Sequence, residues 1–146
     1  MTMKSITDNR AAAQFVKFCL VGAMNTLVTL CTIFICKSLI GVNEYIANAL
    51  GYIMGVINSF LWNKQWVFHS QGRISREAVR FAIGFAICYT LQLITVIALN
   101  TSSLGEIELD TGLMVVSGYG LATIIGCAVY TIFNFIYNRF VTFRKR

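Results

Sequence analysis

The sequence of 146 residues contains no proline and little charge, and both shortages narrow its class. Charged residues make up 12% of the chain, against roughly 25% in a typical soluble domain. Hydrophobic residues make up 57%. This composition predicts a membrane protein. Without proline, the expected helices also lack the commonest cause of a kink.

Acidic residues are scarce, and we expect all of them to lie outside the membrane-spanning runs. A proton-coupled exporter of similar size would be expected to hold an acid within the membrane, so this shortage argues against that class. The single histidine, His69, is interpreted as a solvated interfacial residue and not as a proton relay. No glycine-rich nucleotide loop is present, which argues against ATP as a driver. The six acids are Asp8, Glu44, Glu77, Glu106, Glu108 and Asp110.

The five cysteines form no C-x-x-C pair, and each falls within an apolar run, where a thiol behaves as a small hydrophobic side chain. We therefore expect no disulfide, no metal and no cofactor. The net charge of +6 would suit a nucleic-acid partner only if the basic residues formed one face of a soluble fold. In so apolar a chain they are better explained as topology signals, so no nucleic-acid partner is expected.

Four apolar runs are each long enough to cross the roughly 30 Å hydrocarbon core as a helix. They predict an all-α membrane protein with four transmembrane helices in a single domain, residues 1–146. The remaining chain is too short for a separate catalytic domain, so we expect no enzyme and no catalytic residues. Small residues precede the first run instead of following it, so we expect that run to be retained and not cleaved. The runs cover approximately residues 15–39, 45–67, 81–99 and 113–141.

The basic residues are distributed very unevenly around these predicted spans. Eleven of the twelve fall on one side, and Lys37 alone falls on the other. The positive-inside rule then predicts a multi-pass protein with both termini in the cytoplasm. So uneven a count argues against a protein that inserts in both orientations.

An internal repeat links the ends of the second and fourth runs. The sequence N-K-Q-W-V-F at 63–68 is matched 75 positions later by N-R-F-V-T-F at 138–143. The starts of the first and third runs also match, with V-K-F at 16–18 and V-R-F at 79–81. The chain therefore reads as two helical hairpins of the same design. Because each hairpin would begin and end in the cytoplasm, we expect parallel repeats related by a pseudo-two-fold axis along the membrane normal.

Four segments carry distinctive motifs: 18–25 (F-C-L-V-G-A-M-N), 47–68 with its G-x-x-x-G-x-x-N-S-F, 79–81 and 134–143 (N-F-I-Y-N-R-F-V-T-F). They resemble the GtrA-like family, small four-helix membrane proteins associated with polyprenyl-phosphate-linked sugars in bacterial surface glycosylation. The resemblance covers most of the chain from about Phe15 to Phe143. It implies a flippase that moves undecaprenyl-phosphate-linked monosaccharide from the cytoplasmic to the outer leaflet of the bacterial inner membrane, beside membrane glycosyltransferases. The alternative is a non-transporting subunit that docks or stabilises such a transferase.

Embedded amides and basic residues at the inner interface could together hold such a substrate. A sugar phosphodiester needs cationic donors for its charge and amides for its hydroxyls. For Lys64 and Arg139, each next to an asparagine, we favour a phosphate-binding role over that of snorkelling anchors. For Lys17 and Arg80 both roles stay open. The candidate substrate-binding residues are Asn25, Asn58, Asn63, Lys64, Asn134, Asn138, Arg139, Lys17 and Arg80.

Small residues in the runs are assigned to helix packing, because they permit close approach of two backbones. Gly51 and Gly55 lie four residues apart on the second run, and Gly22 lies on a polar stripe of the first. A bundle of four helices is small for enclosing a sugar headgroup. We therefore expect a homo-oligomer, in the form of a dimer.

Overall fold

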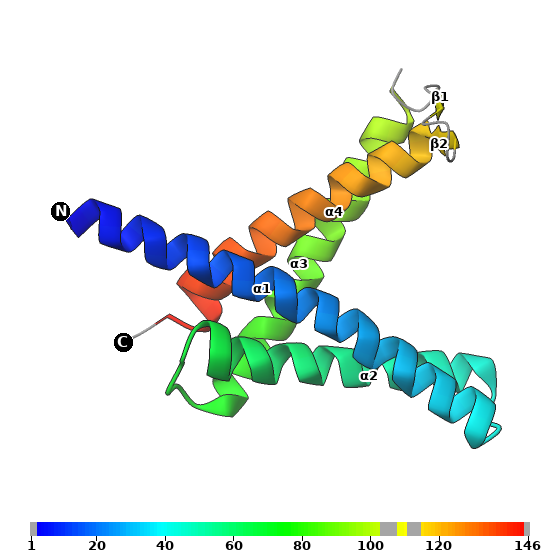
Figure 1. Cartoon of the computed structure of the whole chain (residues 1–146), viewed down its shortest axis with the longest axis horizontal. Helices are drawn as coiled ribbons and strands as arrows, with labels where there is room; N and C mark the ends of the chain where they lie inside the picture. Colours follow the sequence, from blue (N-terminus) through cyan, green and yellow to red (C-terminus); the bar gives the residue numbers. More distant parts are fainter. Residues whose placement is uncertain (1–2, 103–107, 111–114, 145–146) are drawn as a thin grey trace. The chain divides into compact units, whose positions relative to one another are not determined.

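The computed structural model describes residues 3–102, 108–110 and 115–144. Its four α-helices and two short strands are shown in Figure 1. The strands pair antiparallel, with Leu109 opposite Val116, and they are the only departure from helix and loop within the described ranges. The helices are α1 (Met3–Phe34), α2 (Glu44–Trp62), α3 (Ile74–Asn100) and α4 (Gly118–Tyr137), and the strands are β1 (Glu108–Asp110) and β2 (Val115–Ser117).

Helix boundaries differ from the expected spans where polar residues extend or replace helix. Helix α1 begins at Met3, well before residue 15, and α3 begins at Ile74, before residue 81. A hydropathy pattern identifies only the part of a helix that suits the membrane, whereas the helix itself can continue into water. Helix α4 begins at Gly118 and not near residue 113, because β2 occupies the preceding residues. The Ser117 side chain caps α4 by accepting a hydrogen bond from the Gly120 N–H at 3.3 Å.

Three helices end in a π-helical turn, which the apolar periodicity did not indicate. In a π-helix each N–H bonds the carbonyl five residues earlier. Accordingly, the Phe68 N–H bonds the Asn63 carbonyl at 2.9 Å, and the Phe143 N–H bonds the Asn138 carbonyl at 2.9 Å. The turns are η1 (Ile35–Leu39) after α1, η2 (Asn63–Val67) after α2, and η4 (Asn138–Thr142) after α4. The repeated Asn-basic-x-x-x-Phe sequence thus coincides with η2 and η4.

Three segments of the described chain are long and apolar enough to cross a membrane: Asn9–Leu39, Ile74–Asn100 and Gly118–Thr142. Helix α2 does not meet the same criteria, although a span was expected over 45–67. Its 19 residues include the polar side chains of Asn48 and Asn58, which lower its mean hydropathy. The helical membrane class is therefore confirmed, whereas four crossings remain a prediction.

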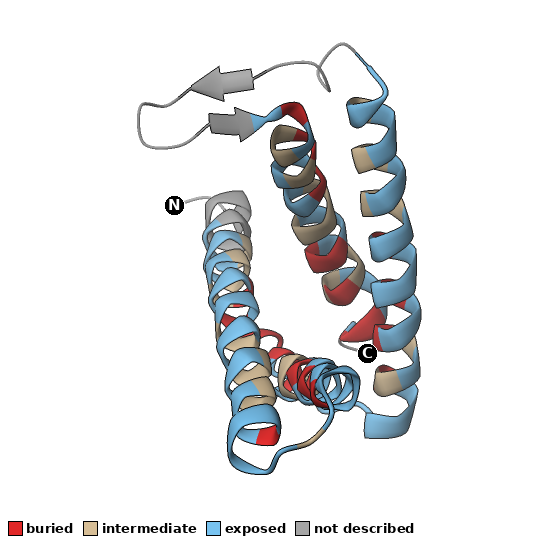
Figure 2. Ribbon diagram, turned by 90° about the vertical axis from the view of Figure 1, so that its right-hand side faces the viewer, coloured by how far each residue is buried: buried red, intermediate tan, exposed pale blue. Residues whose placement is uncertain are grey.

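The chain divides into two compact units, each containing one helical hairpin. Hairpin 1 consists of α1 and α2 within Met1–Gly72, and hairpin 2 consists of α3 and α4 within Arg73–Arg144. Outside the seam between its two helices, each hairpin is largely exposed, and α3 presents mostly exposed surface (Figure 2). Because these exposed residues are apolar, the outer faces suit contact with lipid.

Glycines hold the two helices of each hairpin close together. A Cβ on Gly51 would lie 2.6 Å from Ile33 Cγ1 and 3.0 Å from the Thr29 carbonyl oxygen. On Gly55 it would collide with the Thr29 hydroxyl. The packing role predicted for Gly51 and Gly55 is therefore confirmed. Gly22 does not take this role within hairpin 1, because a Cβ there would meet nothing within 4 Å.

Candidate functional site

The end of hairpin 1 that carries η2 is organised by Asn63, the first residue of that turn. Its Nδ2 donates to the Ser59 carbonyl at 2.8 Å and to the Ser59 Oγ at 3.3 Å. The side chain is 1% exposed. Its Oδ1 is buried without a hydrogen-bond partner in the described part of the chain. Buried amide oxygens are normally paired, so this acceptor marks a place where a donor is missing.

Asn138 forms the same arrangement at the start of η4 in hairpin 2. Its Nδ2 donates to both the carbonyl and the Oδ1 of Asn134, each at 2.8 Å. The Asn138 side chain is fully buried, and its Oδ1 is again without a partner among the residues described. Thr142 Oγ1, in the same turn, is unpartnered as well. Two π turns therefore each carry a buried asparagine with a spare acceptor, and π turns occur often at functional sites.

The basic residues next to these asparagines are placed differently. Lys64 is 9% exposed, and its Nζ donates to the Gly72 carbonyl at 2.7 Å, which ties the following loop to η2. Arg139 is half-buried, and its guanidinium lies 5.6 Å from the Phe140 ring centroid. Lys64 therefore has a structural role, through its hydrogen bond to the loop, in addition to its charge. The Arg139 guanidinium instead lies near an aromatic ring.

The other two candidate cations, Lys17 and Arg80, are also half-buried. Lys17 Nζ lies 5.2 Å from the centroid of the Trp66 ring, within range for a cation–π interaction. Arg80 donates from Nη1 to the Val141 carbonyl at 3.4 Å and so links α3 to η4. Each of the two hairpins thus contributes two basic residues near its π turn.

The embedded amides form two separate groups. Asn58 Nδ2 donates to Asn25 Oδ1 at 2.7 Å, which joins α2 to α1 within hairpin 1. Asn134 belongs to hairpin 2, where its Nδ2 donates to the Tyr130 hydroxyl at 3.2 Å. The 75-position offset of the repeat pairs Asn134 with Ser59, and the contacts agree, since both accept hydrogen bonds from the asparagine of the π turn.

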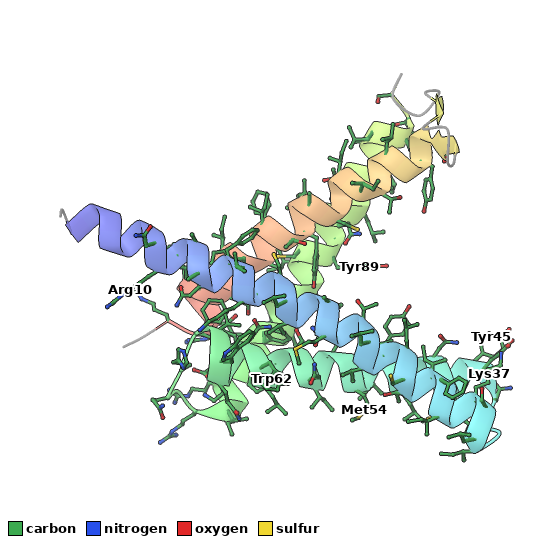
Figure 3. The ribbon with its side chains drawn as sticks, viewed as in Figure 1. Arg10, Lys37, Tyr45, Met54, Trp62 and Tyr89 are labelled. Atoms are coloured by element: carbon green, nitrogen blue, oxygen red, sulfur yellow. The ribbon has the colours of Figure 1, made fainter. Side chains whose placement is uncertain are left out.

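One expectation about acids is wrong. Glu77 was expected outside the spans, but it is 5% exposed and lies within the candidate span Ile74–Asn100, in the first turn of α3. The helix extends beyond its apolar core, which is why the apolar run did not include this residue. Glu44 is exposed at the start of α2, and its Oε2 is 3.2 Å from Nζ of Lys37, which Figure 3 labels. Among the described residues, no group of histidine, cysteine or acidic side chains could hold a metal ion.

Sequence reasoning missed the aromatic contacts that follow the π turns η2 and η4. The rings of Phe18 and Phe68 lie 6.4 Å apart in hairpin 1, and those of Phe81 and Phe143 lie 6.3 Å apart in hairpin 2. All four are buried. The signal was present, because these phenylalanines close the very motifs that repeat, V-[KR]-F and Asn-basic-x-x-x-Phe.

Comparison with known proteins supplies a family and two relatives. Residues 17–143 match the family described as GtrA/DPMS, transmembrane domain. The chain is 22% identical over 144 residues to the cell wall teichoic acid glycosylation protein GtcA of Listeria innocua, covering 96% of this chain and 90% of that protein. It is 33% identical over 66 residues to the uncharacterized membrane protein YngA of Bacillus subtilis, covering 44% of each chain.

Proposed function

Because the chain belongs to the GtrA/DPMS transmembrane-domain family, we propose that it acts in the glycosylation of a cell-surface polymer. Its step is the translocation of undecaprenyl-phosphate-linked monosaccharide from the cytoplasmic to the outer leaflet of the inner membrane. The observation that carries this proposal is the match to a teichoic acid glycosylation protein along 96% of this chain. The protein works beside membrane glycosyltransferases and is not itself an enzyme.

The proposed architecture is two parallel repeats, each a hairpin that crosses the membrane twice. Equivalent contacts support the repeat: Gly51 packs on Thr29, and Gly126, 75 positions later, packs on Gln92, 63 positions after Thr29. The buried asparagines and phenylalanine pairs of the π turns repeat in the same way. Both termini face the cytoplasm in this proposal, as the uneven distribution of basic residues favours. Reporter fusions at Arg146 that gave an external signal would overturn this orientation.

The proposal gives each hairpin its own set of cations and amides for the substrate. The half-buried cations attract the phosphate, because a cation in a partly apolar setting is less screened than one in water. Lys64 adds charge while it holds the loop. The amides contact the sugar hydroxyls. The sets are Lys17, Lys64, Asn25, Asn58 and Asn63 in hairpin 1, and Arg80, Arg139, Asn134 and Asn138 in hairpin 2. The exposed apolar faces of the helices leave the prenyl chain in lipid.

The proposed movement is downhill, driven by consumption of the lipid-linked sugar on the outer face. Since one hairpin pair is small for enclosing a sugar, the working unit is proposed to be a homodimer. Its size in native nanodiscs, measured by mass photometry, tests this point.

Flipping by purified protein is the deciding experiment. Proteoliposomes containing undecaprenyl-phosphate-glucose or undecaprenyl-phosphate-galactose are mixed with an impermeant sugar oxidant, and access to the inner-leaflet pool is followed. The proposal expects faster access than in protein-free vesicles for at least one lipid. No acceleration, together with lower abundance of a partner glycosyltransferase when this protein is deleted, would instead establish a docking subunit. The broad exposed apolar faces of α1 and α3 would then contact the transferase.

A further inference from the structure

Hairpin 2 carries a group of aromatic rings that hairpin 1 does not have. Phe85 and Tyr89, one turn apart on α3, stack with ring centroids 6.2 Å apart and planes at 1°. Phe85 also meets Tyr130 of α4 edge to face, at 6.2 Å. Phe85 is 40% exposed and Tyr89 48% exposed, and Tyr89 stands out from α3 in Figure 3. We call Phe85, Tyr89 and Tyr130 the aromatic surface.

A chain of hydrogen bonds reaches this surface from the inner end of the hairpin. Asn138 Nδ2 donates to Asn134 Oδ1 at 2.8 Å, and Asn134 Nδ2 donates to the Tyr130 hydroxyl at 3.2 Å. The Tyr130 oxygen is therefore an acceptor, and its own proton is left to donate. The described residues offer that proton no hydrogen-bonded acceptor. Donors in such a chain polarise one another, so the last one is strengthened toward an incoming oxygen.

Packing alone does not require these rings. By the 63- and 75-position offsets of the repeat, the hairpin 1 counterparts of Phe85, Tyr89 and Tyr130 are Gly22, Thr26 and Gly55. Hairpin 1 nevertheless packs its two helices closely through Gly51 and Gly55. The space beside Gly22 is open, so the matching position in hairpin 1 is unfilled. The aromatic surface is thus an addition to the common hairpin design.

We propose that the aromatic surface binds the sugar ring of the lipid-linked substrate, with the Tyr130 hydroxyl donating to a sugar oxygen. A pyranose has an apolar face of C–H groups that stacks on exposed rings, and hydroxyls that need nearby polar partners. Ligand sites commonly combine aromatic walls with a few placed polar groups. A surface that only met acyl chains would not need a hydroxyl donor at the end of an amide chain. The inference rests on the proposed function and adds an aromatic contact in hairpin 2 to the polar contacts proposed for the sugar.

The test compares sugar-bearing and sugar-free lipids on the same protein. The full chain in nanodiscs is titrated with undecaprenyl phosphate and with its glucose, galactose and N-acetylglucosamine derivatives, and binding is measured by native mass spectrometry. The parent is expected to prefer at least one sugar-bearing lipid. Tyr89→Leu and Tyr130→Phe should weaken binding of that lipid by about five- to tenfold, with undecaprenyl phosphate unchanged within about twofold. Tyr52→Leu, which removes an exposed ring from α2, is the matched control and should behave as the parent.

Each other outcome decides between the two proposals. If the parent prefers a sugar-bearing lipid and both variants keep that preference, the sugar binds elsewhere and only this inference fails. If the parent binds undecaprenyl phosphate but shows no preference among the lipids, the aromatic surface does not recognise sugar. If the parent binds none of the four lipids, the proposed function fails as well. Tyr130→Phe retains the ring and Tyr89 is largely exposed, so neither variant should fail to fold.

Discussion

Hairpin 1 brings its helices together by omitting side chains, whereas hairpin 2 places rings at the corresponding level. Gly55 lies against Thr29 with no room for a Cβ, and Gly22 leaves open space. Their counterparts in hairpin 2, Tyr130 and Phe85, meet edge to face. At their inner ends the two hairpins agree closely, each with a buried asparagine in a π turn and a pair of phenylalanine rings.

The agreement and the difference have separate meanings. Features present in both hairpins, such as the Gly51 and Gly126 contacts, are required for the two helices of a hairpin to pack together. Features present in only one hairpin are not required for that packing, so they are available for substrate binding. The Asn25–Asn58 pair belongs to hairpin 1, and its positional counterparts in hairpin 2 are Cys88 and Phe133, which cannot form the same amide pair.

The largest effect is expected from filling the close contact of hairpin 1. Gly55→Leu should lower the free energy of unfolding by about 3 kcal/mol or more, because the added side chain must displace Thr29 and separate α1 from α2. Gly22→Leu is the matched control and should change it by less than about 0.5 kcal/mol, since a Cβ there meets nothing within 4 Å. Unfolding in mixed micelles measures both. If both variants lost the same free energy of unfolding, Gly55 would not be a closer helix contact than Gly22, and the prediction would be wrong.

The next effect separates the two inner-end cations. Arg139→Gln should weaken binding of undecaprenyl phosphate by about 1.5–3 kcal/mol, the value of a lost charge-assisted hydrogen bond, with normal melting. Lys64→Gln should lower the melting temperature too, because it loses the 2.7 Å bond to the Gly72 carbonyl. Arg139→Lys should restore little if the guanidinium grips the phosphate with two donors. Parent-like binding by both glutamine variants would place the phosphate elsewhere.

A smaller effect compares the asparagines of the π turns. Asn138→Ala should cost about 1–2 kcal/mol of stability, because it leaves the buried Asn134 oxygen without its donor. Asn63→Ala should cost less, about 0.5–1 kcal/mol, since the Ser59 hydroxyl can turn to its own helix backbone. Chemical unfolding of the two variants in parallel gives the difference. A larger loss at Asn63 would contradict the hydrogen-bond pattern described for hairpin 2.

The smallest effect concerns the amide pair of hairpin 1. A double-mutant cycle with Asn25→Leu and Asn58→Leu should give a coupling energy of about 0.6 kcal/mol, and at most about 1.7, the range for hydrogen bonds between membrane helices. The same cycle at Cys88 and Phe133 should give a value near zero. A coupling energy in hairpin 2 as large as that in hairpin 1 would show that the pair is not specific to one hairpin.

The inner ends could be predicted from sequence, because the Asn-basic-x-x-x-Phe motif marks them and recurs. The apolar pattern could not show that the motif forms π turns, since a π and an α turn differ over only a few residues. Lys64 was recognised as important, but its bond to the Gly72 carbonyl depends on how the following loop folds back. Glu77 was predicted to lie outside the span because the apolar run begins only at residue 81, whereas the helix itself begins at Ile74. The aromatic surface was missed because its rings come from two helices far apart in sequence.

The π turns η2 and η4 each place one more residue between asparagine and phenylalanine than an α-helical turn would hold. Deleting Gln65, an exposed residue of η2, would let α2 continue with ordinary α-helical bonds. Phe68 would then follow Asn63 by four residues of α-helix, which places it at nearly the same angle as five residues of a π turn. It would still face Phe18, its partner at 6.4 Å. Insertion of a residue beside Gln65 has no such compensation, and in an α-helix one residue turns the chain by about 100°.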